Sequence, residues 1–238
     1  MNWWLRAAFD VVLPRVCPPC GCPLPAGASS PLCEACRDAL VDPAMPCCPC
    51  CGGAPGAGAR RCAPCLGHPP AFETARALGP YVAAGGGNVL ARTVQHLKYR
   101  EARVLAGPLA DLLAARYPFG CDAVLVPVPL HRTRLRARGY NQALLLARGL
   151  ARRLDLALAP RLLERTRATA EHASLSAAAR RVNVQGAFRA RPGCRLGRPT
   201  VVLVDDVLTT GATADACARV LRAAGARTVH VYTIGRAA

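Results

Sequence analysis

The sequence predicts an α/β protein with a parallel sheet flanked by helices, preceded by a cysteine-rich module. Three observations support this prediction. From about Phe72 onward, short β-branched apolar runs alternate with segments of helical periodicity, which is typical of β-α-β units. Eleven of the fourteen cysteines fall before residue 66, mostly in C-x-x-C pairs. The apolar run 201–204 leads directly into two adjacent carboxylates, and sheets of this kind bind ligands at the C-terminal ends of their strands.

The chain divides into two predicted domains at a turn-rich stretch, Gly67-His-Pro-Pro70. Residues 1–70 would form an N-terminal helix and the cysteine module, and residues 71–238 the sheet domain. A chain of 238 residues has room for one large and one small domain.

The first residues have apolar side chains at near-helical spacing, and we expect a short amphipathic helix from Met1 to Val16 that packs on the rest of the protein. Only Arg6 precedes the apolar stretch, and no convincing cleavage site follows, so we predict no signal peptide. No apolar run is long enough for a membrane span. Together with the paired cysteines, these features favour the reducing cytoplasm.

Four C-x-x-C units predict two metal sites. Each unit brings two sulfur atoms within reach of one ion, and two units make the tetrahedral all-thiolate site that Zn²⁺ prefers. We expect a double zinc ribbon whose ligands are Cys17, Cys20, Cys33, Cys36, Cys48, Cys51, Cys62 and Cys65. Such a site has no open coordination position, so zinc is expected to stabilise the fold rather than to take part in catalysis.

The register of the third unit has two solutions, because Cys47 and Cys50 also form a C-x-x-C pair. We favour Cys48 and Cys51, since the C-P-x-C-G pattern around them repeats the first unit. In this register Cys22, Cys47 and Cys50 are spare thiols.

The chain is strongly basic, with a net charge of +17, and Lys98 is its only lysine. A positive field of this size attracts phosphorylated ligands and DNA backbones. A GC-rich genome also produces an arginine-rich composition, so the charge alone does not select a nucleic-acid partner.

The sheet domain is predicted from apolar runs, assigned as strands, and from segments with helical spacing. In chain order we expect a strand at 77–82, helices at 89–99 and 103–117, a strand at 123–128, a helix at 140–154, a strand at 201–204, a helix at 212–224 and a strand at 228–234. The last three segments form a β-α-β unit, so their two strands should be parallel.

The segment Val201–Thr213 combines a buried strand, an acidic turn and the start of a helix. Carboxylates such as Asp205 and Asp206 accept hydrogen bonds from sugar hydroxyls, and helix-start N–H groups and threonine hydroxyls bind phosphate. A solvated turn with a side-chain helix cap is the simpler reading, but it leaves the Thr-Thr-Gly-x-Thr continuation unexplained. A Walker loop needs a Gly-Lys pair, which the chain lacks, and a haloacid-dehalogenase site separates its two aspartates by one residue.

This segment resembles the signature of type I phosphoribosyltransferases, which bind phosphoribosyl pyrophosphate. The resemblance implies that Asp205 and Asp206 bind the ribose hydroxyls and serve catalysis, and that Mg²⁺ accompanies the donor. It also implies a loop that wraps the 5′-phosphate. The residues of this loop would be Thr209, Thr210, Gly211, Ala212 and Thr213.

A second candidate anion site follows the strand at 123–128, where Pro-Val-Pro-Leu-His precedes four arginines at the alternate positions 132 to 138. We expect an extended loop in which these arginines line one side of a polyanion, with a merely solvated basic loop as the equal alternative. By the resemblance, the stretch from Val128 to Arg138 meets the pyrophosphate.

The order of the motifs extends the resemblance over nearly the whole chain. They are V-P-V-P-L, R-G-Y-N-Q, R-T-R-x-T and V-D-D-V-x-T-T-G-x-T, behind the C-x-x-C units. In this order the chain is similar to the ComF/GntX family, bacterial proteins with a zinc-finger start and a phosphoribosyltransferase-like body. One branch of that family is linked to competence and imported single-stranded DNA.

The family resemblance implies three alternative functions. The first is a phosphoribosyltransferase linked to DNA uptake, and the second is a non-enzymatic module that binds single-stranded DNA or competence proteins. The third is a regulator that senses phosphoribosyl pyrophosphate or a nucleotide. The chain departs from the family at Glu171-His172, where relatives have Thr-Gln, in a loop expected to cover the active site.

Overall fold

The computed structural model describes residues 15–42, 47–99, 103–169, 177–193 and 200–237. The predicted amphipathic helix at Met1–Val16 and the divergent pair Glu171-His172 lie outside the described residues, apart from the last two positions of that helix.

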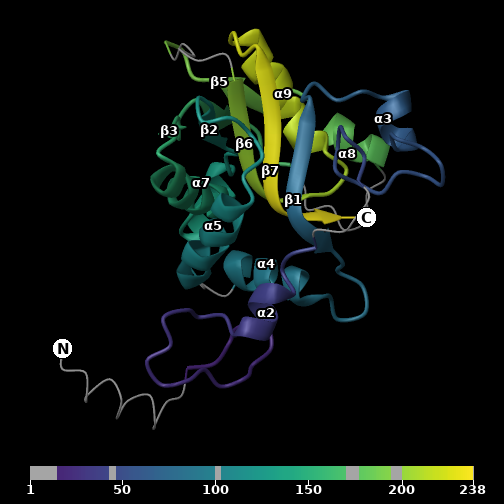
Figure 1. The fold of residues 1–238 in the computed structure, drawn as a ribbon. Helices are drawn as coiled ribbons and strands as arrows, with labels where there is room; N and C mark the ends of the chain where they lie inside the picture. Colours follow the sequence, from purple (N-terminus) through teal and green to yellow (C-terminus); the bar gives the residue numbers. More distant parts are fainter. Residues whose placement is uncertain (1–14, 43–46, 100–102, 170–176, 194–199, 238) are drawn as a thin grey trace.

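A five-stranded parallel sheet forms the centre of the molecule (Figure 1), as the alternating pattern of strands and helices predicted. Its spatial order is β1 (Thr74–Tyr81), β7 (Thr228–Ala237), β6 (Thr200–Leu208), β2 (Val124–Pro127) and β3 (Ala157–Leu158). The strand that carries the acidic pair, β6, therefore lies in the middle of the sheet. A central strand is buried on both faces, which explains its nearly unbroken β-branched and leucine run.

Helices cover both faces of this sheet (Figure 1). One face carries α4 (Val89–Tyr99), α5 (Ala106–Ala115) and α7 (Gln142–Leu154). The other face carries α9 (Ala212–Ala223), against which α8 (Ala177–Val184) and the antiparallel pair β4 (Leu163–Arg165) and β5 (Phe188–Ala190) pack. A short 3₁₀ turn, Arg103–Leu105, leads into α5.

Successive residues of β6 point into two separate cores, because side chains alternate between the faces of a strand. Val201 and Leu203 join the core under α9, together with Cys217 and Leu221 of that helix. Val202 and Val204 join the core under α4, α5 and α7. This alternation determines which helices each carboxylate at the end of the strand can reach.

Most predicted elements are confirmed within a few residues, and two predictions were wrong. The strand at 201–204 continues through Leu208, so the acidic pair lies inside β6 rather than in a turn after it. Pairing to β7 at Asp205 and Val207 holds these residues in extended conformation despite the low β-propensity of aspartate.

The second error concerns the arginine-rich stretch, which forms the helix α6 (Arg132–Arg138) instead of an extended loop. The His131 side chain accepts a hydrogen bond from the Thr133 N–H at the start of α6, and Gly139 ends the helix in the left-handed conformation. Alternate residues of a helix point in different directions, so the four arginines do not form one row.

The two cysteine segments attach to different sides of the sheet domain. The first contains α2 (Glu34–Asp38) and packs with Leu40, Leu78 and Leu90 near α4. The second contains α3 (Ala63–Gly67) and packs with the core under α9 (Figure 1). Each cysteine segment thus contributes to one of the two cores.

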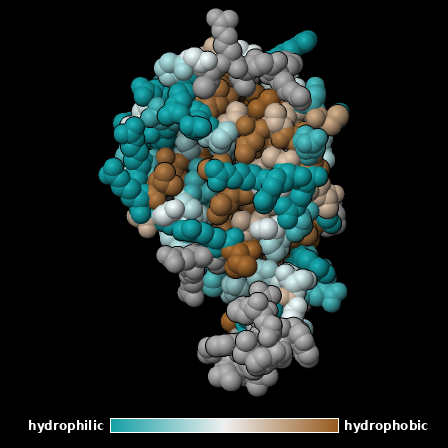
Figure 2. Space-filling model, turned by 90° about the vertical axis from the view of Figure 1, so that its left-hand side faces the viewer, coloured by the Kyte–Doolittle hydropathy of each residue, from teal (hydrophilic) through white to brown (hydrophobic). Residues whose placement is uncertain are grey.

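Figure 2 shows the side of the molecule that carries α7 and β3. Hydrophobic side chains gather in the middle of this face, with hydrophilic side chains around and across them. Over the described part of the chain, no helix is both long and apolar enough to cross a membrane.

Candidate functional site

The two adjacent carboxylates of β6 point to opposite faces of the sheet. Asp206 is buried and faces the α4 and α7 side, where both of its side-chain partners lie. Asp205 interacts electrostatically with Arg165 and Cys217 on the α9 side. The pair therefore offers one carboxylate to each of two different surroundings.

Asp206 is held by a cation and an amide. Lys98 Nζ lies 2.8 Å from its Oδ1, and Gln142 Nε2 donates to its Oδ2 at 2.5 Å. Burial acts to lower the pKa of Lys98, but the Asp206 carboxylate outweighs this effect and raises it. The contact with Asp206 thus favours the charged ammonium form of Lys98.

The same network extends to Arg138, which the family resemblance predicts to contact the pyrophosphate. Arg138 Nη1 donates to Gln142 Oε1 at 2.6 Å, and its guanidinium lies 5.1 Å from the centre of the Tyr99 ring. An amide that accepts from Arg138 and donates to Asp206 has a fixed orientation. Arg138, Gln142 and Lys98 consequently form one connected group around Asp206.

The surroundings of Asp205 change the proton affinity of its carboxyl group. Burial and the adjacent Asp206 carboxylate raise the pKa of Asp205 to about 7, although Lys98 and Arg165 counteract this rise. Its Oδ1 accepts a hydrogen bond from the Asp206 N–H at 2.8 Å. A carboxyl group with a pKa near neutrality exchanges protons readily at physiological pH.

The predicted phosphate loop connects β6 to α9. Thr209 and Thr210 are exposed, and Gly211 adopts a left-handed φ of 80° directly before the helix. The helix begins at Ala212, and Thr213 lies in its first turn. The first N–H groups of a helix have no partner within it and carry positive potential, so this end can bind an anion.

The loop predicted to meet pyrophosphate starts at the end of β2. Val128 is buried, and its N–H donates to the Val204 carbonyl at 2.9 Å. The Asn141 side chain donates to the Val128 carbonyl at 3.0 Å and accepts from the first turn of α7. These contacts hold Val128 beside β6, one strand away from the acidic pair.

Helix α6 divides its four arginines into two pairs. Arg134 and Arg138 are half-buried, and Arg134 donates to the Thr169 carbonyl at 3.2 Å. Arg132 and Arg136 are exposed, with Arg132 3.5 Å from Glu164. Positions four apart share a helix face, so one pair is directed toward the protein and the other toward solvent.

Both predicted cysteine clusters come together. The Sγ atoms of Cys17, Cys20, Cys33 and Cys36 lie within 4.8 Å of one another, as do those of Cys48, Cys51, Cys62 and Cys65. Four thiolates at tetrahedral zinc distance would stand roughly 3.8 Å apart, so both sets fit a zinc ion. Backbone N–H groups already point at sulfur in the first cluster, as from Cys36 to Cys33 at 3.4 Å.

The structure groups the third unit in the favoured register. Cys48 and Cys51 are buried in the second cluster, whereas Cys47 is exposed. Cys22, expected to be spare, has its Sγ 3.2 Å from that of Cys20. We therefore assign Cys22 as a thiol next to the first cluster, outside the set of four.

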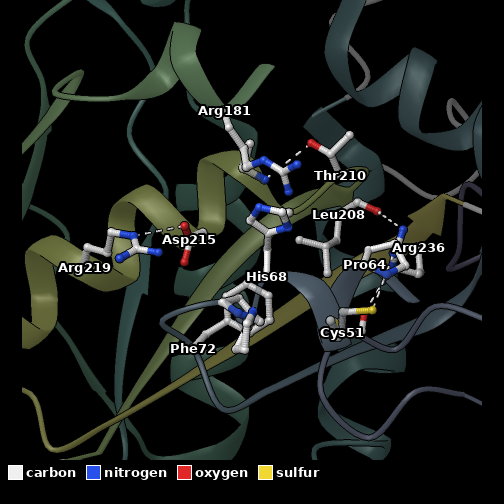
Figure 3. A pocket seen from close by; sticks show the side chains of 15 residues that line it. Cys51, Pro64, His68, Phe72, Arg181, Leu208, Thr210, Asp215, Arg219 and Arg236 are labelled. Atoms are coloured by element: carbon white, nitrogen blue, oxygen red, sulfur yellow. Dashed lines mark hydrogen bonds and ion pairs between the residues drawn. The ribbon is translucent and has the colours of Figure 1, made fainter. Parts of the chain in front are cut away.

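A pocket of about 120 Å³ lies between the predicted phosphate loop and the second cysteine cluster (Figure 3). Its lining combines the start of α9 with apolar side chains such as Phe72 and with several cationic groups. The Arg181 side chain points toward Thr210, and the His68 ring lies near the middle of the view. Asp215 is paired with Arg219 at 3.1 Å.

The sequence prediction missed four residues of this region, namely Lys98, Gln142, Arg165 and Arg236. The sequence did contain a signal that could have identified Lys98 as a site residue, because it is the only lysine of an arginine-rich chain. Gln142 and Arg165 belong to motifs that the sequence already highlighted, but their direction could not be known. Arg236 lies two residues from the C-terminus, outside any motif.

Comparison with known proteins supplies the family. No protein-family model matches the chain. The chain is 32% identical over 176 residues to Competence protein F of Haemophilus influenzae, a match that covers 71% of this chain and 75% of that protein. It is 37% identical over 154 residues to DNA utilization protein YhgH of Escherichia coli O157:H7, covering 62% and 67%. It is also 37% identical over 158 residues to DNA utilization protein YhgH of Salmonella typhimurium, a match that covers 62% of this chain and 67% of that protein. With its two cysteine clusters and parallel sheet, the chain belongs to the Competence protein F (ComF) family.

Proposed function

We propose that this protein binds phosphoribosyl pyrophosphate with Mg²⁺ and transfers its phosphoribosyl group, in the service of DNA uptake. The observation that carries the proposal is the acidic pair near the end of the central strand β6, two residues before a Thr/Gly loop and the start of α9. Acidic side chains suit sugar hydroxyls, and the helix start suits a phosphate, so one strand-loop-helix unit serves both ends of a ribose 5-phosphate.

Each residue then has a defined task. Asp205 and Asp206 orient the ribose through its hydroxyls. The segment Thr209–Thr213 anchors the 5′-phosphate by N–H and hydroxyl groups. Val128 and Arg138 lie on the side of β2, where the pyrophosphate would meet the backbone and a guanidinium. Bound Mg²⁺ would neutralise charge on the pyrophosphate.

Lys98 has a role that follows from its contact with Asp206. The ammonium group takes the place on this carboxylate that a hydroxyl or a cation would otherwise take. A buried carboxylate without a partner is costly, so Lys98 stabilises the site before the ligand arrives. When the ligand binds, Lys98 is then free to contact it as a cation. In such a preorganised site, catalysis would come mainly from positioning the substrate and from stabilising charge in the transition state.

The biological setting is proposed from the names of the relatives. Competence protein F and DNA utilization protein YhgH point to the uptake or use of DNA. We also propose that residues 1–70 form the zinc module and residues 71–238 the sheet domain, and that the protein works in the cytoplasm, where thiolates remain reduced. The two zinc ions stabilise the fold in this proposal.

Isothermal titration calorimetry with phosphoribosyl pyrophosphate and Mg²⁺ tests the proposal. We expect binding by the natural protein and none by Asp205→Ala combined with Asp206→Ala. The control is Asp111→Ala combined with Asp122→Ala, which also removes two carboxyl groups but at exposed positions. Equal affinity of the acidic-pair variant and the natural protein would refute the site. Pyrophosphate release with a panel of nucleobase acceptors would then test transfer itself.

A second candidate function is binding of single-stranded DNA, favoured by the exposed pair Arg132 and Arg136 on α6. Cations on an accessible helix face bind DNA phosphates without sequence preference, and the affinity falls as salt rises. We expect Arg132→Ser combined with Arg136→Ser to weaken binding of a fluorescent oligonucleotide and to reduce the salt dependence. If the acidic-pair variant loses DNA binding as well, DNA occupies the sugar-phosphate site and this second function fails.

A further inference from the structure

Arg236 joins the second cysteine cluster to the phosphate loop. Its Nε donates to the Cys51 carbonyl at 3.0 Å, and its Nη1 donates to the carbonyls of Leu208 and Thr209 at 3.2 and 2.7 Å. Its Nη2 also lies 3.7 Å from Cys51 Sγ. One guanidinium thus contacts a residue of the candidate zinc site at one end and the start of the loop at the other (Figure 3).

The turn that carries Cys51 is fitted closely to the sheet. The Cys50 carbonyl accepts from the Ala75 N–H at 2.6 Å, which ties the turn to the edge strand β1. A side chain at Gly52 would place its Cβ 2.9 Å from the Ala75 carbonyl oxygen, and one at Gly53 would place its Cβ 2.7 Å from Arg236 Nη2. At Gly52 the close atom belongs to the backbone, so only glycine allows this approach, whereas a side chain at Gly53 would require the Arg236 guanidinium to shift.

The contact also sets the direction of the loop. A peptide unit is planar and trans, so its C=O and N–H point in opposite directions. Because the carbonyls of Leu208 and Thr209 point at Arg236, the N–H groups of Thr209 and Thr210 point away from it. Arg236 thereby orients two N–H donors of the loop that the proposed function assigns to phosphate.

The first cysteine cluster has a comparable link that leads elsewhere. Arg92 Nε donates to the carbonyl of Pro19, inside the Cys17–Cys20 turn, at 2.8 Å, and its Nη1 donates to Gly87 at 2.6 Å. That guanidinium joins the first cluster to α4 and the loop before it. The two clusters are thus chemically alike but attach to different parts of the protein.

We propose that the second cysteine cluster, when it holds its metal, positions the phosphate loop through Arg236, so that phosphate binding depends on this cluster. Arg236 is a positioning residue in this proposal. The inference rests on the proposed sugar-phosphate function for its binding readout, but the order of the loop can be measured without any ligand.

Hydrogen exchange of the backbone amides tests the link directly. We expect Arg236→Gln to keep both zinc ions by elemental analysis while exchange of the amides between Asp206 and Thr213 speeds up at least tenfold. Gly53→Ala retains Arg236, but its added Cβ would push the guanidinium aside. This variant should therefore also speed up the exchange of these amides. Arg92→Gln is the matched control and should leave these amides unchanged. Unchanged exchange in Arg236→Gln, or an equal effect of Arg92→Gln, would overturn the proposal.

Calorimetry separates this proposal from the proposed function. If the natural protein binds phosphoribosyl pyrophosphate, Arg236→Gln should weaken the affinity about tenfold and Arg92→Gln should not. If it binds no such ligand, the proposed function fails, while faster exchange in Arg236→Gln still supports the link. Should Arg236→Gln fold poorly by circular dichroism, Arg236→Lys retains the charge but cannot reach Cys51 and Thr209 together. Loop exchange like that of the natural protein in folded Arg236→Lys would also overturn the link.

Discussion

Replacing Lys98 by methionine should destabilise the protein strongly, because Asp206 would lose its charged partner inside the core. The Lys98 Nζ–Asp206 Oδ1 distance is 2.8 Å, and the exposed fraction of the two side chains is 23% and 5%. At this distance the attraction is about 6 kcal/mol for an effective dielectric constant of about 20. Desolvation offsets much of it, and removing one partner of a buried pair typically costs about 3–5 kcal/mol. We expect about 3 kcal/mol, at the lower end, since Lys98 retains some contact with water.

A double-mutant cycle isolates the pair. Urea unfolding of Lys98→Met, Asp206→Asn and the double variant should give a coupling free energy of about 2 kcal/mol. The control cycle uses Arg153→Met and Asp111→Asn, an ion pair between α7 and α5 in which Asp111 is 64% exposed. This exposed pair should couple by less than about 1 kcal/mol. Equal coupling in the two cycles would refute the reasoning that burial makes the Lys98 contact strong.

Three further predictions concern stability. Asp205 has its pKa raised to about 7 in the folded protein, so the folded state retains a proton that the unfolded chain releases above its ordinary value of 3.8. Stability should therefore fall as pH rises between these values, and Asp205→Asn should remove this slope in urea unfolding from pH 5 to 8; parallel curves would contradict the assignment. Gly211→Ala should cost about 1 kcal/mol, because φ is 80° there while its Cβ would meet only ordinary contacts. Gly107→Ala, in the helix α5 with open space, should be neutral or stabilising by comparison. Tyr232→Phe removes a buried hydroxyl that donates to the Leu113 carbonyl at 2.8 Å and should cost about 1–2 kcal/mol in thermal unfolding; an unchanged melting temperature would show that this carbonyl finds another partner.

Elements with strong periodicity could be predicted from the sequence. The helix at 89–99 was predicted with its observed bounds, because its apolar residues repeat on one face. The two cysteine clusters followed from the C-x-x-C spacing, because the sulfur atoms of cysteines three positions apart in a turn reach one ion. The end of β6 was missed, since neighbouring strands rather than local propensity keep Asp205 and Val207 extended.

The arginine-rich stretch was misjudged for a different reason. Alternating arginines suggest an extended chain, yet Gly139 is an ordinary helix stop signal that was present in the sequence. The cap by His131 is not a usual start signal, since Ser, Thr, Asp and Asn are the preferred N-cap residues, and only the structure shows it. The division of the α6 arginines into an inward and an outward pair then follows from helical spacing.

By itself, the sequence determined which chemical groups are present at the candidate sites of this protein. Cysteines occur in pairs, two carboxylates follow an apolar run, and a Thr/Gly stretch precedes a helix, all of which are local patterns of a few residues. Only the tertiary structure decided which distant groups meet them. Lys98 and Gln142 reach Asp206, and Arg236 reaches Cys51 and Thr209, because the order of strands brings α4, α7 and the end of β7 beside β6. Such contacts between distant segments depend on packing and topology, which local sequence patterns do not encode.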